Sequence, residues 1–251
     1  MFSILIRRMT FWLWPTLALT LAVPSQAGIV LNTTRVILNG ADKEAGLTVH
    51  NTGTGDILAQ SWLESEDASG APANLPFAIT PALARMSGDG KQLIRIIYAG
   101  DGLPKDRESV FWINVQEIPQ TANENELQIA IRQRIKLFYR PRGLVADPLK
   151  AAQALHWQVR DGALEATNPG PYHVSMIKLE ARHNGRVILQ EDSRMLAPMQ
   201  RVRLPLSSGA SGPLDLAFIS INDFGAQEPY RARVSGERFT QASKAEHHPD
   251  E

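Results

Sequence analysis

The chain has 251 residues, of which 43% are hydrophobic, and its 26 basic and 26 acidic residues give a formal net charge of zero. This length suits two domains of about 100 residues each, although one larger β domain would also fit. A neutral chain has no field to attract nucleic acid, and the absence of cysteine excludes disulfides, thiol catalysis and cysteine-bound metal.

Residues 1–27 have the pattern of a secretory signal. Arg7 and Arg8 precede an apolar run over residues 10–23, and the small residues Ser25 and Ala27 follow two positions apart. A basic start, a short apolar segment and a small-x-small site predict cleavage after Ala27. A transmembrane anchor is the alternative, but the run is shorter than the ~20 apolar residues that span a bilayer. We therefore expect an exported protein.

The rest of the chain has the pattern of an all-β protein. Short runs rich in β-branched and aromatic residues are separated by Gly, Pro, Asn and Asp, which is typical of β-sandwiches. We expect strands at Gly46–Asn51, Leu58–Leu63, Leu93–Tyr98, Val110–Glu117, Leu127–Tyr139, His156–Arg160, Val174–Glu180, Val187–Leu189, Leu214–Ile221 and Tyr230–Phe239. Pro141–Lys150 is the best linker candidate, and Pro141 should end the preceding strand.

Two neighbouring strands carry the most information. In 111–116, apolar residues alternate with Trp112, Asn114 and Gln116, which indicates a half-buried strand. In the next strand, one face carries three aliphatic side chains: Leu127, Ile129 and Ile131. Because only the short polar segment Gln120–Glu126 separates the two strands, we expect a hairpin.

No segment has the spacing of a catalytic or metal-binding motif. The nucleophile elbow, the paired metal histidines and the phosphate-binding glycine loops are all absent from the sequence. We expect the histidines on the surface or on strands, without a metal: His50, His156, His173, His183, His247 and His248. The acidic cluster of Glu64, Glu66 and Asp67 is expected to be a solvated loop. We therefore predict no catalytic residue and no cofactor.

Several blocks of sequence resemble one known family. They are Gly28–Ile37, Leu58–Trp62, Phe77–Pro81 with Arg85, Gln92–Ile96, Asp106–Pro119, Leu127–Ile131, Arg134–Pro141, Thr167–Pro169 and Ile221–Gly225. In this order they are similar to the PapD-like periplasmic chaperones of the chaperone–usher pathway. The resemblance implies two immunoglobulin-like β-sandwich domains in an L or boomerang arrangement, at residues 28–142 and 148–242, with Gly28–Ile37 as the first strand.

The resemblance also implies a binding site. Arg35 and Lys136 would bind the C-terminal carboxylate of a pilus subunit, and two cations can hold one carboxylate through charge-assisted hydrogen bonds. Leu127, Ile129 and Ile131 would form the donor strand that fills the open core of the subunit. The alternatives are that the two cations are ordinary exposed charges and that the aliphatic side chains pack into the chain's own core.

Two further features bear on this site. Strict alternation places Lys136 on the face opposite to Ile131, so a bulge or strong twist near Arg132–Arg134 would be needed for both to face one subunit. By resemblance, Glu108, Arg140 and Asp223 form an ion network that fixes the angle between the domains, the alternative being three unrelated surface charges.

The predicted function is that of a periplasmic chaperone, not an enzyme, that binds pilus subunits and delivers them to an outer-membrane usher. Neither nucleic acid nor a metal is implied. Because a free strand edge is an aggregation liability, we also expect some self-association. The alternatives are an adhesive immunoglobulin-like fibre protein and a secreted hydrolase.

The sequence departs from the family pattern at two loop positions. Asp56 and Ala82 stand where members often have proline, which puts in doubt any regulation that depends on these prolines. The short connection at Gln120–Glu126 resembles the short-loop branch of the family.

Overall fold

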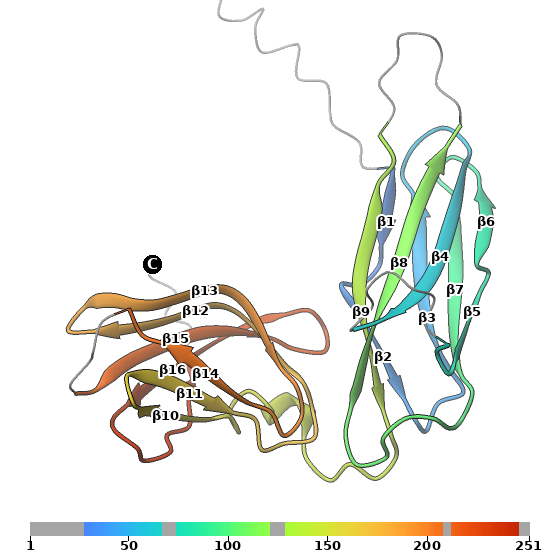
Figure 1. The fold of residues 1–251 in the computed structure, drawn as a ribbon. Helices are drawn as coiled ribbons and strands as arrows, with labels where there is room; N and C mark the ends of the chain where they lie inside the picture. The colour runs from blue at the N-terminus through green and yellow to red at the C-terminus, as the bar shows by residue number, and fades with distance from the viewer. Residues whose placement is uncertain (1–27, 67–73, 121–128, 208–211, 246–251) are drawn as a thin grey trace, which may run out of the picture.

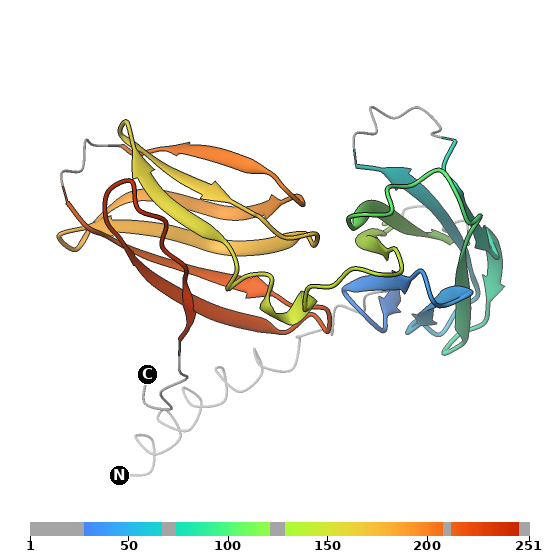
Figure 2. The ribbon, with the colours of Figure 1, turned by 90° about the horizontal axis from the view of Figure 1, so that it is seen from below.

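The structure, a computed structural model, describes residues 28–66, 74–120, 129–207 and 212–245, so the expected signal and Leu127 lie outside it. Figure 1 shows two β-sandwiches set at an angle to each other, like the arms of an L. Figure 2 shows the connecting segment crossing between them. The predicted all-β fold of two immunoglobulin-like domains is confirmed.

The N-terminal sandwich consists of two sheets. Their strand orders are β1-β3-β7-β5 and β2-β9-β8-β4-β6. The strands are β1 (Ile29–Leu31), β2 (Arg35–Asn39), β3 (Glu44–Asn51), β4 (Ile57–Ser65), β5 (Phe77–Thr80), β6 (Leu83–Met86), β7 (Lys91–Tyr98), β8 (Ser109–Pro119) and β9 (Arg132–Arg140). Inward-facing residues such as Leu47, Ile96 and Ile113 are fully buried between the sheets.

The C-terminal sandwich has its own core. Its sheets have the orders β10-β11-β14 and β13-β12-β15-β16-β17. The strands are β10 (His156–Arg160), β11 (Ala163–Thr167), β12 (Val174–His183), β13 (Arg186–Leu196), β14 (Arg201–Pro205), β15 (Leu214–Ile221), β16 (Gln227–Val234) and β17 (Ser243–Lys244). Trp157 and Phe218 pack together at the centre of this core, and their ring centroids lie 5.5 Å apart.

The first strand expected from the sequence is two strands. β1 pairs with β3 in one sheet, whereas β2 pairs with β9 in the other. The chain changes sheets at Asn32–Thr34, where side chains satisfy backbone groups that a continuous strand would pair. The Asn32 side chain accepts a hydrogen bond from the Thr48 N–H, and the Thr33 hydroxyl donates to the Arg35 carbonyl. As a result, β2 begins at Arg35.

The hairpin predicted around Gln120 is confirmed, but its second strand begins later than expected. β8 and β9 pair in one continuous antiparallel register from Ser109↔Tyr139 to Gln116↔Arg132. Residues 129–131 are not part of a strand, although the Glu117 N–H still donates to the Ile131 carbonyl at 2.9 Å. β9 ends at Arg140, directly before Pro141, which lacks the N–H that a further ladder bond would need.

Candidate functional site

β2 covers only one end of β9. It runs parallel to β9 and pairs Arg35 with Lys136, continuing to Asn39 with Arg140. On the other side of β9, the ladder to β8 continues to Arg132. Within the described ladders, residues 132–135 therefore pair with β8 alone, and this part of β9 is an open sheet edge. Figure 1 shows β9 on the side of its domain that is turned toward the C-terminal domain, with β2 beside its lower end.

The main chain of β9 directs alternate residues toward this open edge. The hydrogen bond between Glu117 and Ile131 identifies them as a hydrogen-bonded pair of the β8–β9 ladder. In an antiparallel ladder, hydrogen-bonded pairs alternate with pairs that are not hydrogen-bonded. The main chain of Gln133 therefore bonds to β8, whereas the N–H and C=O groups of Arg132 and Arg134 point away from β8. An added strand could pair with these groups.

The structure has no bulge near Arg132–Arg134, one of the two features that would have let Ile131 and Lys136 face one subunit. The β8–β9 register has no shift over these residues, so the faces alternate strictly. Ile135 and Leu137 point into the domain core, and Ile131 extends the same face, while Lys136 lies on the outer face. A partner that pairs with the edge of a sheet meets both faces, so no bulge is required for it to contact Ile131 and Lys136.

The two described residues of the expected donor strip are accessible. Ile129 is 68% exposed and Ile131 is half-buried, and neither belongs to the buried core of the domain. Leu127, the third residue, lies outside the described residues.

Arg35 and Lys136 lie side by side where the open edge ends. Arg35 donates from Nη1 to the Ile221 carbonyl of β15 at 2.9 Å, and its guanidinium lies 5.8 Å from the centre of the Phe138 ring. Burial lowers the pKa of Arg35, against the attraction of Asp223 and Glu108. Burial, followed by repulsion from Arg35, also lowers the pKa of Lys136. Within the described part of the chain, neither cation forms an ion pair, so both are available to an external anion.

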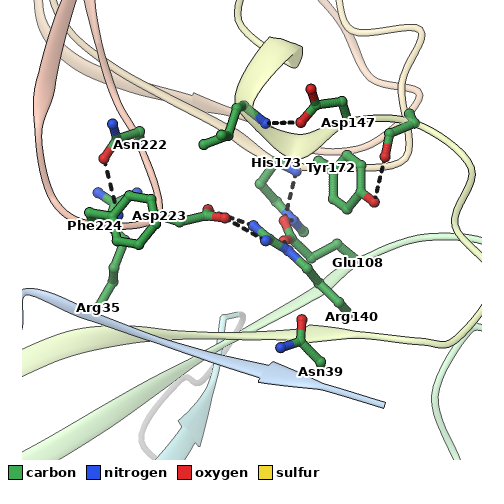
Figure 3. A network of polar contacts seen from close by, with 12 residues as sticks. Arg35, Asn39, Glu108, Arg140, Asp147, Tyr172, His173, Asn222, Asp223 and Phe224 are labelled. Atoms are coloured by element: carbon green, nitrogen blue, oxygen red, sulfur yellow. Dashed lines mark hydrogen bonds and ion pairs between the residues drawn. The ribbon is translucent and has the colours of Figure 1, made fainter. Parts of the chain in front are cut away.

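The structure brings Glu108, Arg140 and Asp223 together between the two domains (Figure 3). Arg140 donates from Nε to Glu108 at 2.7 Å and from both Nη atoms to the Asp223 carboxylate at 2.6 and 2.7 Å. The Glu108 side chain is only 1% exposed, and that of Asp223 is 24% exposed. Burial alone would lower the pKa of Arg140, but its hydrogen bonds with Asp223 and the charge of Glu108 hold it above the ordinary value.

His173 is a fourth member of this network, and the expectation that it is a surface or strand residue is wrong. Its side chain is 4% exposed, and both its Nδ1 and its backbone N–H lie 2.8 Å from Glu108 Oε2. The Glu108 N–H donates to the Pro171 carbonyl, which adds a backbone bond between the domains. The position of His173 beside the block Thr167–Pro169 was the only sequence signal for this role, because its partner is 65 residues away.

The acidic cluster is not simply a solvated loop. Glu64 lies on β4, where it accepts a hydrogen bond from Trp62 Nε1 at 2.9 Å and pairs with Arg134 at 3.2 Å. The hydrogen bond with Trp62 lowers the pKa of Glu64. Glu66 is exposed just beyond the strand, and Asp67 lies outside the described residues.

The two departures from the family pattern have ordinary contacts. The Asp56 carboxylate accepts two hydrogen bonds from Arg85, and the Ala82 carbonyl accepts one from the Ser61 N–H. No group of His, Asp and Glu side chains among residues 28–66, 74–120, 129–207 and 212–245 could hold a metal ion. In the same residues, no helix is long and apolar enough to cross a membrane.

Comparison with known proteins gives matches over both domains. Residues 28–145 match the family "Pili and flagellar-assembly chaperone, PapD N-terminal domain", and residues 150–232 match "Pili assembly chaperone PapD, C-terminal domain". The chain is 40% identical to the chaperone protein FimB/FhaD of Bordetella pertussis, covering 86% of this chain and 92% of that protein. It is 37% identical to the probable fimbrial chaperone YadV of Escherichia coli, covering 84% and 91%.

Solved structures agree with these matches. The crystal structure of the YadV chaperone superposes with a TM-score of 0.72 at 37% identity, covering 83% of this chain and all of that one. A Salmonella enterica complex of the SafA pilin with the SafB chaperone matches with a TM-score of 0.69 at 25% identity, covering 84% and 99%.

Proposed function

The chain belongs to the PapD family of pilus-assembly chaperones, and from this premise we propose how its residues hold a subunit. It is a periplasmic chaperone that stabilises pilus subunits by donor-strand complementation and delivers them to an outer-membrane usher. The family consists of chaperones and not of enzymes, so the hydrolase and the fibre protein are no longer candidates. The main support for the proposed site is the open edge of β9, which ends at the two cations Arg35 and Lys136.

The open edge fixes the direction of the bound strand. Its usable N–H and C=O groups lie at Arg132 and Arg134, and β2 occupies the edge from Lys136 onward. A subunit strand that lies on this edge can bring its C-terminal carboxylate to Arg35 and Lys136 only if it runs toward β2, in the same direction as β9. The bound strand would then end where β2 begins.

The anchor acts on the main chain of the subunit. A carboxylate at a chain end is present in every subunit, whatever its sequence, and two half-buried cations can bind it through charge-assisted hydrogen bonds. Arg35 is already oriented by its bond to the Ile221 carbonyl, and Lys136 lies opposite it in the ladder. The pair would therefore set the register of the bound strand without reading its side chains.

We propose Leu127, Ile129 and Ile131 as the donor side chains. Chaperone–pilin pairing is an established form of strand addition, in which main-chain bonds give affinity and alternate side chains fill pockets. The high exposure of Ile129 leaves it available for this purpose. Each aliphatic side chain buried in the subunit contributes about 1.5–3 kcal/mol before ordering costs are subtracted.

The ion network of Glu108, Arg140 and Asp223 is proposed to orient the two domains. Asp223 follows Ile221 by two residues, so the contact that holds Asp223 on Arg140 also places the Ile221 carbonyl against Arg35. Separate cores in the two sandwiches support the proposal that residues 28–142 and 148–242 are the domains. Assignment to the short-loop branch and self-association through the open edge of β9 also remain proposals.

The test is subunit recovery from the periplasm. Tagged wild type, Lys136→Ala and Arg132→Ala are purified from cells that assemble pili, and co-eluting proteins are quantified by mass spectrometry. Loss of one charge-assisted contact should lower recovery in Lys136→Ala about tenfold or more, with the melting temperature nearly unchanged. Arg132 is an exposed cation on the same strand, so its variant should retain the subunits. Equal recovery from Lys136→Ala and wild type would refute the anchor.

A further inference from the structure

Four side chains form a single row across the outer face of the N-terminal sheet. Glu64 on β4 is paired in register with Trp112 on β8, Trp112 with Lys136 on β9, and Lys136 with Arg35 on β2. Along this row a carboxylate lies on one side of Trp112 and the two anchor cations lie on the other. The indole ring is thus the only row member between Glu64 and Lys136.

The Trp112 ring lies close to two cations of β9, Lys136 directly opposite it in the ladder and Arg134 two residues earlier. The Lys136 ammonium lies 5.6 Å from the centre of the indole ring, and the Arg134 guanidinium lies 4.2 Å from it. A ring face attracts a cation weakly and does not neutralise it. Lys136 is therefore held against a surface that orients the ammonium, and within the described ranges no acceptor occupies its N–H groups, which can serve a stronger acceptor.

Two carboxylates, Glu64 on β4 and Glu66 just beyond its end, are close enough to compete for Lys136. Glu64 and Lys136 lie two strands apart, which is about 9.5 Å between backbones, and long side chains that reach toward each other can span this gap. Glu66, just beyond the end of β4, already attracts the Lys136 ammonium and opposes the lowering of its pKa. Glu64 is at present occupied by Trp62 and Arg134 instead.

We propose that Trp112 is a positioning residue for the anchor: its ring separates Lys136 from Glu64 and so keeps the lysine free to bind a subunit carboxylate. This inference rests on the proposed function of Lys136. A lysine that paired with an acidic side chain of its own domain would have to give up that pair to bind a subunit. Trp112 prevents such a pair without placing a competing charge in the site.

The test uses a short synthetic peptide of alternating apolar and polar residues, with either a free C-terminal carboxylate or a C-terminal amide. Affinity of the full-length chaperone for each peptide is measured by fluorescence anisotropy. Trp112→Leu should weaken binding of the carboxylate peptide about tenfold, the equivalent of one charge-assisted hydrogen bond. Binding of the amide, which lacks the charge, should change little.

The decisive variant restores the free lysine without restoring the ring. Trp112→Leu combined with Glu64→Gln and Glu66→Gln should recover the affinity of the wild type to within about threefold, because no carboxylate remains to capture Lys136. As a matched control, Trp112→Leu is combined with Asp89→Asn and Asp101→Asn, which remove two exposed charges elsewhere in the domain. This control should stay weak.

Three outcomes would overturn the inference. If the triple variant with glutamines binds no better than Trp112→Leu, the ring acts by packing or by direct contact with the peptide. If the control variant regains affinity for the carboxylate peptide as fully as the glutamine variant does, the gain is a general effect of removing negative charge. If Trp112→Leu alone binds the carboxylate peptide as the wild type does, Lys136 does not need the ring to keep it away from a carboxylate of its own domain. Failure of the anchor is recognised separately, since Lys136→Ala would then bind the carboxylate and amide peptides as the wild type does.

Discussion

Lys136 lies half-buried at the end of the open edge of β9, and burial lowers the pKa of its ammonium group below the ordinary value of 10.5. A subunit carboxylate prefers the protonated lysine. Affinity should therefore be complete below the pKa of Lys136 in the free chaperone and should fall as the pH rises through that pKa, earlier than for an exposed lysine.

A substitution at the same position separates this effect from general alkaline damage. Arginine remains protonated well above the range in which lysine titrates. Lys136→Arg should thus retain affinity for a carboxylate-terminated peptide to higher pH than the wild type, in binding titrations over the alkaline range. Circular dichroism at each pH reports whether the fold persists. Parallel loss of affinity in both proteins would contradict a role for the lysine proton.

Single residues differ in how far the sequence could place them. The family resemblance implied that Glu108 belongs to an interdomain network, whereas His173 was missed because its contact with Glu108 joins two domains. His173 directly precedes β12, where no periodic pattern separates a buried hydrogen-bonding role from a surface one. Glu64 was misjudged because it lies on β4, where Trp62 two residues away donates to it, and because its partner Arg134 reaches it only when β4, β8 and β9 are assembled.

At the scale of the element, β9 pairs with β8 on one side and is proposed to pair with a subunit on its open edge, and substitutions can separate these two roles. The N–H of Arg132 points to the open edge, whereas that of Gln133 bonds to β8. Arg132→Pro should leave the melting temperature within a few degrees of the wild type but greatly reduce subunit recovery, because proline removes a donor from the edge that pairs with the subunit.

Gln133→Pro is the matched control for this prediction. It removes an N–H that bonds to β8 within the sheet, and the acceptor left without its partner should lower the free energy of unfolding by about 1–3 kcal/mol. Urea denaturation measures both variants. If Arg132→Pro destabilises the protein as much as Gln133→Pro does, the two N–H groups do not face opposite sides, and the assignment of the edge is incorrect.

Periodicity predicted the interior strands well and their ends poorly. Residues 156–160 and 214–221 were placed correctly, since buried alternating side chains define both. The start of β9 was wrong, because the aliphatic alternation at Ile129 and Ile131 continues beyond the first residue of the ladder, Arg132. The break at Asn32–Thr34 was missed because it depends on polar side chains: the Thr33 hydroxyl donates to the Arg35 carbonyl, and the Asn32 side chain accepts from the Thr48 N–H of β3.

At the scale of the whole molecule, the proposed anchor depends on both domains. Lys136 and Arg35 belong to the N-terminal sandwich, but the carbonyl that orients Arg35 belongs to Ile221 of the C-terminal one. Arg140 binds Asp223 at the end of the same strand. The resemblance to a family could predict that these residues are near one another, whereas the orientation of Arg35 follows only from how the two domains dock.

Breaking the contact between Arg140 and Asp223 should therefore weaken subunit binding, although neither residue is proposed to touch the subunit carboxylate. In Asp223→Ala, Arg140 keeps Glu108 as a partner and can contact water, so the free energy of unfolding should fall by only about 1–3 kcal/mol. In Arg140→Ala, Glu108 keeps its buried charge with His173 alone, and the loss should reach about 3–5 kcal/mol. Urea denaturation gives both values.

Small-angle X-ray scattering and subunit recovery complete the test of Asp223→Ala. Without the bidentate pair, the domains should sample wider arrangements, the Ile221 carbonyl should no longer hold Arg35, and recovery should fall although both anchor cations are intact. Asp215→Ala, at the other end of β15, is the control that should change neither measurement. If Asp223→Ala keeps the scattering profile and the subunits of the wild type, the network does not set the geometry of the anchor, and Arg35 must be oriented by the N-terminal domain alone.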